Sequence, residues 1–230
     1  MLLTPAELEV LALSVKVAFT SALLGLPLAL GLAFLLARTE FPGKTLVDGI
    51  VHLPLVLPPV VIGYLLLVGF GRNGAIGAFL AEHFGIVFAF RWTGAALASA
   101  VMGLPLAVRA MRQAVETVDR RLEAAAATLG APPLAVFVTV TLPLIMPGVL
   151  NGMLLAFARS LGEFGATITF VSNIPGETQT LPLAIYTLTQ VPGGDAQAMR
   201  LCVLSILISL GALTVSELLL RRARRRAQGT

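Results

Sequence analysis

Long apolar stretches separated by short charged segments run through the whole sequence. A helix that crosses a membrane needs about 20 consecutive, mostly apolar residues. Five stretches approach or exceed that length with at most one charged residue each; they cover residues 10–37, 49–70, 92–108, 136–158 and 201–220. The pattern therefore predicts an all-α, polytopic membrane protein with about five transmembrane helices.

The second of these stretches contains three prolines, Pro54, Pro58 and Pro59. Proline has no backbone N–H to donate, so it interrupts the hydrogen bonds of a helix. We therefore expect this helix to begin late or to be kinked.

Two other apolar stretches are poorer candidates for spans. Residues 73–90 contain Glu82 and His83, and residues 181–191 make up only about half the length that a span needs. We expect both to be surface or re-entrant segments outside the main spans.

The distribution of Lys and Arg predicts which end of each span is cytoplasmic, because cytoplasmic loops retain basic residues. With five spans and the C-terminus inside, eleven of the sixteen basic residues fall on the inner side: Arg38, Lys44, Arg109, Arg112, Arg120, Arg121, Arg221, Arg222, Arg224, Arg225 and Arg226. Only Arg72, Arg91 and Arg200 fall on the outer side. We expect the N-terminus outside and the C-terminus in the cytoplasm.

Composition excludes several classes of function. The chain has 230 residues, of which 57% are hydrophobic and 12% charged, and its mean hydropathy is +0.92. Soluble domains carry about 25% charged residues, so a soluble enzyme, a nucleic-acid-binding protein and a disordered chain are all disfavoured. The net charge of +4 fits basic cytoplasmic loops. One cysteine and two histidines offer too few ligands for a metal site.

The most informative loop covers residues 116–135, within the stretch ETVDRRLEAAAATLGAPPLAV. Its alanine run favours a helix, which Gly130 and the following prolines should end. We expect a short helix, a turn and a second short helix at the cytoplasmic face. From the residues alone, an amphipathic helix that lies on the membrane surface is an equally good interpretation.

This loop resembles the EAA loop of ABC importer permeases. The family pattern is Glu-Ala-Ala, three residues, Gly, nine residues, Ile, any residue and Leu-Pro. Here Gly130 is followed by nine residues, Val140, Thr141, Leu142 and Pro143. The first half departs from the pattern by one position, or about 100° on a helix: Ala124, Ala125 and Ala126 occupy the Glu-Ala-Ala places, and Glu123 stands just before them.

The resemblance extends over most of the chain and is greatest to the permease subunits of molybdate importers, with sulfate permeases next. It is carried by ARTEFPGK at 37–44, HLPLVLPPVVIGYLLL at 52–67 and ARSLGEFGATITFVSNIPGET at 158–178. It implies a type I ABC importer permease fold, with residues 1–230 as a single transmembrane domain in the cell inner membrane. A sulfate or tungstate permease is the alternative.

The resemblance also implies the partners. Two copies of a separate ATPase subunit, which carry ATP and Mg²⁺, would dock on the loop, and an extracytoplasmic molybdate-binding protein would deliver the cargo. The coupling residues would be Glu123, Ala124, Ala125, Ala126, Gly130, Leu142 and Pro143. We expect a homodimer in membrane lipid, with no nucleic acid and with no cofactor or metal in this chain.

Arg159 and Glu163 are the charged residues that stand out near a span, at the outer end of the fourth. Residues four apart share a helix face and can pair, and charges at membrane depth usually face a protein interior or a water path. The pair is therefore a candidate for the translocation path or a gate. The alternative is a structural ion pair that fixes the helix end.

Two other classes of function remain as rivals. An ATP-independent channel or carrier would need no more than the same spans. An intramembrane enzyme is less favoured, because the chain lacks a Ser/His, Asp/Asp or HExxH constellation.

Overall fold

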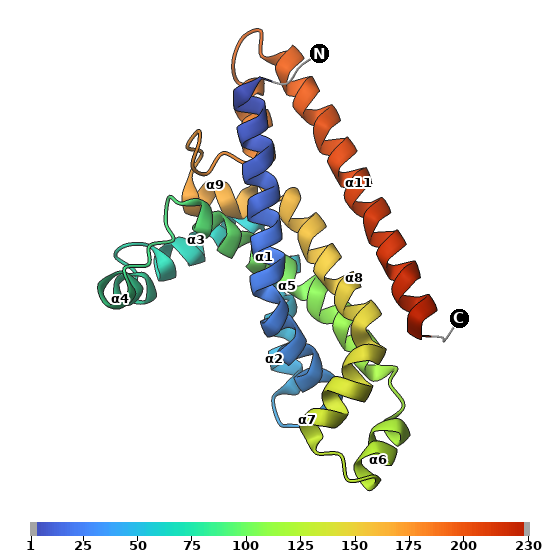
Figure 1. Cartoon of the computed structure of the whole chain (residues 1–230). Helices are drawn as coiled ribbons and strands as arrows, with labels where there is room; N and C mark the ends of the chain where they lie inside the picture. Colours follow the sequence, from blue (N-terminus) through green and yellow to red (C-terminus); the bar gives the residue numbers. More distant parts are fainter. Residues whose placement is uncertain (1–3, 228–230) are drawn as a thin grey trace.

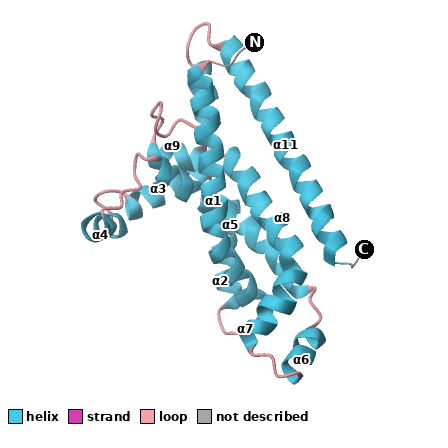
Figure 2. Ribbon diagram, in the orientation of Figure 1, coloured by secondary structure: helices cyan, strands magenta, loops and turns pink. Residues whose placement is uncertain are grey.

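The computed structural model describes residues 4–227, and every regular element in that range is helical (Figure 2). The elements are α1 (Pro5–Arg38), α2 (Lys44–Val56), α3 (Pro59–Phe70), α4 (Ala75–Phe84), α5 (Trp92–Glu116), α6 (Arg120–Thr128), α7 (Pro133–Val136), the π-helical turn η1 (Phe137–Thr141), α8 (Leu142–Leu161), α9 (Gly165–Val171), α10 (Leu181–Thr189) and α11 (Asp195–Ala227). The all-α prediction is confirmed for this range.

Three long helices, α1, α5 and α8, pack against one another and form the centre of an elongated molecule (Figure 1). The last helix, α11, runs along the outside, where it contacts α8 and α10. The short helices α3, α4 and α9 project to one side of the bundle, and α6 and α7 lie at one end of it (Figure 1).

Small residues let α5 and α8 approach each other closely. A Cβ atom on Gly152 would lie 2.9 Å from the backbone oxygen of Ala107 and 2.9 Å from the Met111 side chain. Gly103 faces Ala156 in the same way, at 3.2 Å from its Cα atom. Lipid tails are as apolar as a leucine side chain, so the hydrophobic effect does not drive helices together in a membrane. Close packing of this kind is one of the attractions that replace it.

Four helical segments of the described range are long and apolar enough to cross a membrane: Pro5–Arg38, Trp92–Thr117, Pro133–Leu161 and Asp195–Val215. They coincide with four of the five predicted spans. The remaining predicted span, 49–70, is split into α2 and α3, which are bent by 114° at a short break. The expected kink is therefore confirmed, and it is sharp enough to make two separate helices.

The break follows from the two consecutive prolines. Pro58 disfavours the helical conformation of the residue before it, and α2 accordingly ends at Val56 with Leu57 extended. Pro59 then begins α3, a position where its missing N–H costs nothing. The two weaker apolar stretches contain the short helices α4 and α10, of 10 and 9 residues, which are too short to span a bilayer.

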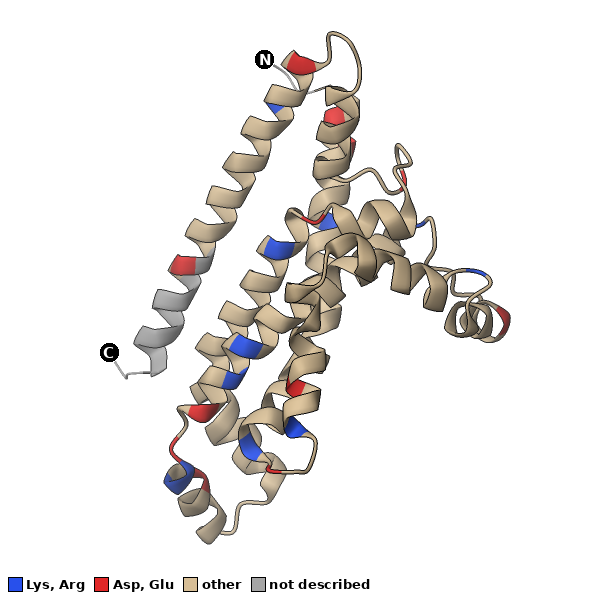
Figure 3. Ribbon diagram, turned by 180° about the vertical axis from the view of Figure 1, so that it is seen from behind, with Lys and Arg blue, Asp and Glu red and all other residues tan. Residues whose placement is uncertain are grey.

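The largest group of charged residues in the described range lies at the end of the molecule that holds α6 and α7, hereafter the α6 end (Figure 3). The six internal basic residues assigned to the cytoplasmic side lie on the last turn of α1, the start of α2, the second half of α5, and α6. The helix α11 continues to Ala227, but the side chains of the terminal arginine run lie outside the described residues.

Candidate coupling site

The loop after α5 folds as the sequence predicts, into a short helix, a turn and a second short helix. Asp119 caps α6 by accepting a hydrogen bond from the Arg121 N–H at 2.9 Å. Gly130 ends α6 with a φ of +86°, a left-handed conformation that other residues rarely adopt. Pro133 then starts α7 at its first position.

The helix α6 has no buried residue. Leu122 of α6 and Leu129, the residue that follows its last turn, are seven residues apart and therefore lie on the same side of the helix. The Leu129 side chain is 89% exposed and Leu122 50%. Leu134 of α7 is 75% exposed. These three side chains, hereafter the exposed leucines, form no part of the chain's own core. Ala124 and Ala125 are also exposed, and Ala126 is half-buried.

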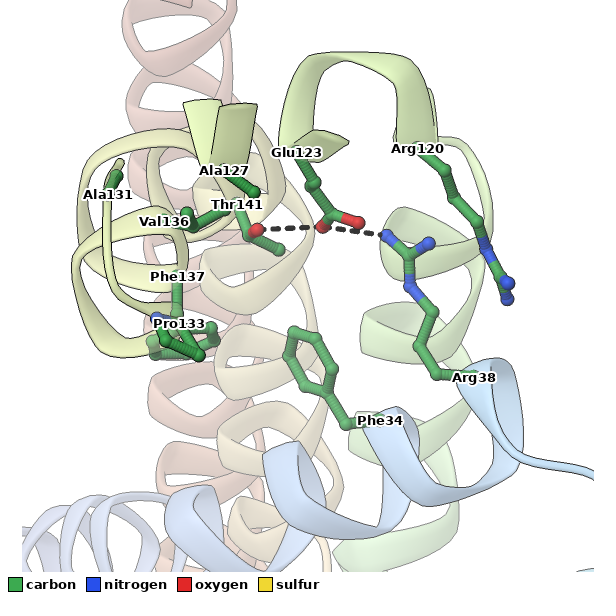
Figure 4. A pocket seen from close by; sticks show the side chains of 10 residues that line it. All are labelled: Phe34, Arg38, Arg120, Glu123, Ala127, Ala131, Pro133, Val136, Phe137 and Thr141. Atoms are coloured by element: carbon green, nitrogen blue, oxygen red, sulfur yellow. Dashed lines mark hydrogen bonds and ion pairs between the residues drawn. The ribbon is translucent and has the colours of Figure 1, made fainter. Parts of the chain in front are cut away.

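Glu123 behaves differently from its neighbours, because its carboxylate turns toward the bundle. Its Oε1 atom accepts a hydrogen bond from Nη2 of Arg38 at 3.0 Å and one from Oγ1 of Thr141 at 2.7 Å (Figure 4). Arg38 is the last residue of α1, and Thr141 is the last residue of η1. One carboxylate thus joins α6 to two other elements.

A cavity of about 490 Å³ lies beside this carboxylate. Its apolar wall includes Phe34 and Phe137, whose rings meet edge to face with centroids 5.5 Å apart. Arg38 and Arg120 add positive charge to the lining (Figure 4). The space between α6 and the end of α1 is therefore bridged by polar bonds and is not filled by side chains.

Leu142 and Pro143 stand at the start of α8, directly after η1. Leu142 is half-buried and Pro143 is exposed. Pro143 has no N–H with which to continue the α-helical hydrogen bonds, and the Leu142 N–H bonds the Phe137 carbonyl in the wider π-helical pattern. The Leu-Pro part of the motif therefore shapes the helix entry that places Thr141 opposite Glu123.

The turn between α1 and α2 carries a second ion pair of the α6 end. Nζ of Lys44 lies 2.7 Å from Oε1 of Glu40, and the Glu40 side chain is almost fully exposed. This hydrogen bond, together with the positive charge of Lys44, lowers the pKa of Glu40 below its usual value. Within the described residues, neither side chain forms a hydrogen bond or an ion pair with α6 or α7.

Arg159 and Glu163 form an ion pair at the junction of α8 and α9, with Nη1 of Arg159 2.7 Å from Oε2 of Glu163. The Glu163 side chain is only 1% exposed. Its other oxygen accepts a hydrogen bond from the Ala166 N–H at 2.8 Å, at the start of α9. The pairing that the spacing predicted is confirmed, and its second bond fits a structural role at the junction.

A second polar hollow, of about 420 Å³, lies between α2 and α5. Arg112 joins the two helices there, because its guanidinium lies 3.3 Å from Asp48 and 2.8 Å from Glu116. His52 is half-buried in the lining of this hollow, 3.3 Å from the Asp48 carboxylate. Within the described residues, no cluster of three or more His, Cys, Asp or Glu residues could hold a metal ion.

Sequence reasoning found the loop but missed the partners of Glu123. Arg38 lies 85 residues from Glu123 along the chain, and it was used only as a marker of membrane orientation. Thr141 lies inside the recognised motif, but the motif gives no reason to single it out. The position of Arg38 at the end of a span, inside the family-like segment ARTEFPGK at 37–44, was the one signal available.

Comparison with known proteins decides the family. Residues 18–226 match the model of the binding-protein-dependent transport system inner membrane component. The chain belongs to this family. It is 59% identical to the molybdenum transport system permease protein ModB of Escherichia coli, over 99% of both chains. It is 36% identical to the sulfate transport system permease protein CysT of Salmonella typhimurium, over 89% of this chain and 75% of the relative.

A solved structure shows the same fold. The bacterial ABC transporter that imports the acidic polysaccharide alginate matches 96% of this permease and 80% of its own chain, with a TM-score of 0.74 and 18% identity. The permease is therefore a multi-pass inner-membrane protein with the fold of ABC importer permeases.

Proposed function

We propose that this chain is the membrane-spanning, non-catalytic subunit of a molybdate importer, with residues 1–230 as a single permease domain. The observation that carries the proposal is the 59% identity to a molybdenum permease over nearly the whole of both chains. The sulfate permease, at 36% identity over less of the relative, makes sulfate the weaker candidate. Tungstate, which shares the charge and shape of molybdate, stays as the alternative cargo.

In this proposal the coupling site is the segment 116–135 together with the start of α8. The exposed leucines favour it, because apolar side chains left uncovered at one end of a molecule commonly mark a protein interface. Their partner would be a separate ATPase subunit, and ATP and Mg²⁺ would be bound there. Of the predicted coupling residues, four are exposed enough to meet such a partner directly: Ala124, Ala125, Gly130 and Pro143.

The assembly we propose is a twofold homodimer with two ATPase subunits at the α6 end and a molybdate-binding protein at the other end. Few helices are available in one chain to enclose a path, and symmetric dimers are the commonest oligomers. The basic residues of the α6 end favour its cytoplasmic location, with the N-terminus outside. The remaining apolar surface would face membrane lipid.

Transport would then follow alternating access. Closure of the two ATPases upon ATP binding would move the coupling segments, and the helix bundles would rock between outward-open and inward-open states. ATP can drive this change only if it binds one state more tightly than the other. Arg159 and Glu163 would hold the α8–α9 junction beside the path; a direct contact with the oxyanion is a further role that the forked guanidinium could serve.

The test is reconstitution of the tagged chain with its co-purified ATPase in liposomes, with the candidate binding protein added. We expect molybdate-loaded binding protein to stimulate ATP hydrolysis and uptake, and sulfate-loaded binding protein to do neither. Gly130→Arg should abolish uptake and ATPase binding but leave membrane insertion intact, because the left-handed turn is strained for any residue other than glycine.

Other outcomes would contradict the proposal. Equal stimulation by sulfate would overturn the choice of cargo. A chain that purifies without an ATPase and conducts anions, even after ATP depletion at a clamped membrane potential, would favour the channel. Normal uptake by Gly130→Arg would remove the coupling role of the loop.

A further inference from the structure

The carboxylate of Glu123 is the polar link between α6 and the membrane-spanning bundle. Helices are usually held in place by the burial of an apolar face, but α6 buries none of its residues. It packs mainly against α7 and η1, next to a cavity of about 490 Å³. Apolar packing therefore contributes little to the angle at which α6 leaves the bundle.

The hydrogen bonds of Glu123 can fix the angle of α6, which apolar packing does not fix. Its Oε1 atom accepts from Arg38 at 3.0 Å and from Thr141 at 2.7 Å. Both bonds have an ionised partner, and such bonds are shorter and stronger than neutral ones. The two side chains of the ion pair are only 25% and 17% exposed, so water competes weakly for them.

The direction of this side chain explains the one-residue departure from the EAA pattern. A shift of one residue rotates a side chain by about 100° around a helix. The position that the pattern gives to the family's glutamate is Ala124, which is exposed, whereas Glu123 faces α1 and η1. The Oε1 atom of this carboxylate is therefore already bonded to two elements of its own bundle.

We propose that Glu123 is a positioning residue that fixes α6 to the ends of α1 and α8, so that a force applied to α6 moves both helices together. The proposal rests on the proposed function, in which an ATPase docks on α6. The helices α1 and α8 pack against each other and against α5. A push on Leu122 or Leu129 would thus reach α1 and the start of α8 through this carboxylate, in addition to the chain connections of α6 to α5 and α7.

The test compares Glu123→Gln with Glu40→Gln in the full reconstituted transporter. Glu40 is a matched control, because it is a carboxylate of the same end whose ion pair is with Lys44 and not with a residue of α6 or α7. We expect Glu123→Gln to retain bound ATPase and ATP hydrolysis, while the ATP consumed per cargo ion rises about tenfold, since a bond to a charged group is lost. Glu40→Gln should behave as the wild type.

A charge exchange separates positioning from simple loss of structure. Arg38→Glu combined with Glu123→Arg restores an ion pair between the same two positions, and we expect it to recover the coupling ratio to within about twofold, since neighbouring partners couple energetically. Thr141→Val should give an intermediate ratio, because it removes one of the two bonds. Failure of the exchange to improve on either single variant would contradict the proposal.

A second readout needs no ATPase at all. A nitroxide attached to Leu129→Cys in a Cys202→Ala background should become more mobile when Glu123→Gln is added, in the chain alone in nanodiscs. An unchanged spectrum would overturn the proposal and leave the proposed function untouched. Loss of the ATPase from the Glu123→Gln complex, with an unchanged spectrum, would assign Glu123 to the ATPase interface instead.

Discussion

At the residue scale, Glu163 shows how one buried carboxylate can hold two helices in register. One oxygen accepts from the first turn of α9, and the other pairs with Arg159 on the last turn of α8. An acidic group at a helix N-terminus also compensates the partial positive charge there. Removal of the side chain would leave a backbone N–H and a guanidinium without these partners.

We expect Glu163→Ala to destabilise the protein by about 2–3 kcal/mol, and Glu163→Gln by less, because glutamine can still accept from the Ala166 N–H. The thermal unfolding midpoint of the purified chain in detergent measures both. A role in the path predicts a different result, in which Glu163→Gln alters uptake while the unfolding midpoint stays that of the wild type.

At the element scale, α5 and α8 depend on glycine where they cross. Gly152 has no room for a side chain, because Ala107 and Met111 already occupy the space a Cβ atom would need. Gly211 of α11 has nothing within 4 Å of that position. A larger side chain at Gly152 would therefore displace neighbouring atoms, whereas the same side chain at Gly211 would displace none.

We expect Gly152→Leu to destabilise the bundle by about 1–3 kcal/mol or more, the usual cost of overpacking. Gly211→Leu should change little. The yield of monodisperse protein and its unfolding temperature provide the measurement, and equal effects at both glycines would show that the close crossing contributes nothing to stability.

Sequence patterns predicted the helical elements well, because apolar length is a local property. The four long helices, the proline break and the helix-turn-helix of the coupling site all follow from residues that are neighbours in the chain. The partners of Glu123 do not. Arg38 is brought to it by the packing of α1 against the bundle, and no local pattern encodes a contact across 85 residues. Side-chain direction on α6 likewise depends on what lies beside it.

At the scale of the whole molecule, the two ends differ in charge and in their exposed surfaces. The α6 end carries the six internal basic residues assigned to the cytoplasmic side and the exposed leucines, and the turn between α10 and α11 lies at the other end beside the first turn of α1 (Figure 1). A bilayer separates two such ends, so each should be open to reagents from one side only.

Two single-cysteine variants in a Cys202→Ala background test this with a membrane-impermeant maleimide. We expect Gln190→Cys to be labelled in intact spheroplasts. We expect Leu129→Cys to be labelled only in inside-out vesicles without ATPase. Both residues are exposed, so access is governed by the side of the membrane. The reverse labelling pattern would refute the N-out, C-in assignment and the cytoplasmic location of the α6 end.

The bend between α2 and α3 also has a consequence for biogenesis. The two helices have 13 and 12 residues, and neither reaches the roughly 20 apolar residues by which the insertion machinery recognises a span. The two helices pass the test of length and hydropathy for a span only together, so we expect the insertion machinery to read them as one segment and the bend to form afterwards, as they pack against α5. The topology of the segments downstream depends on the pair entering the bilayer as one unit.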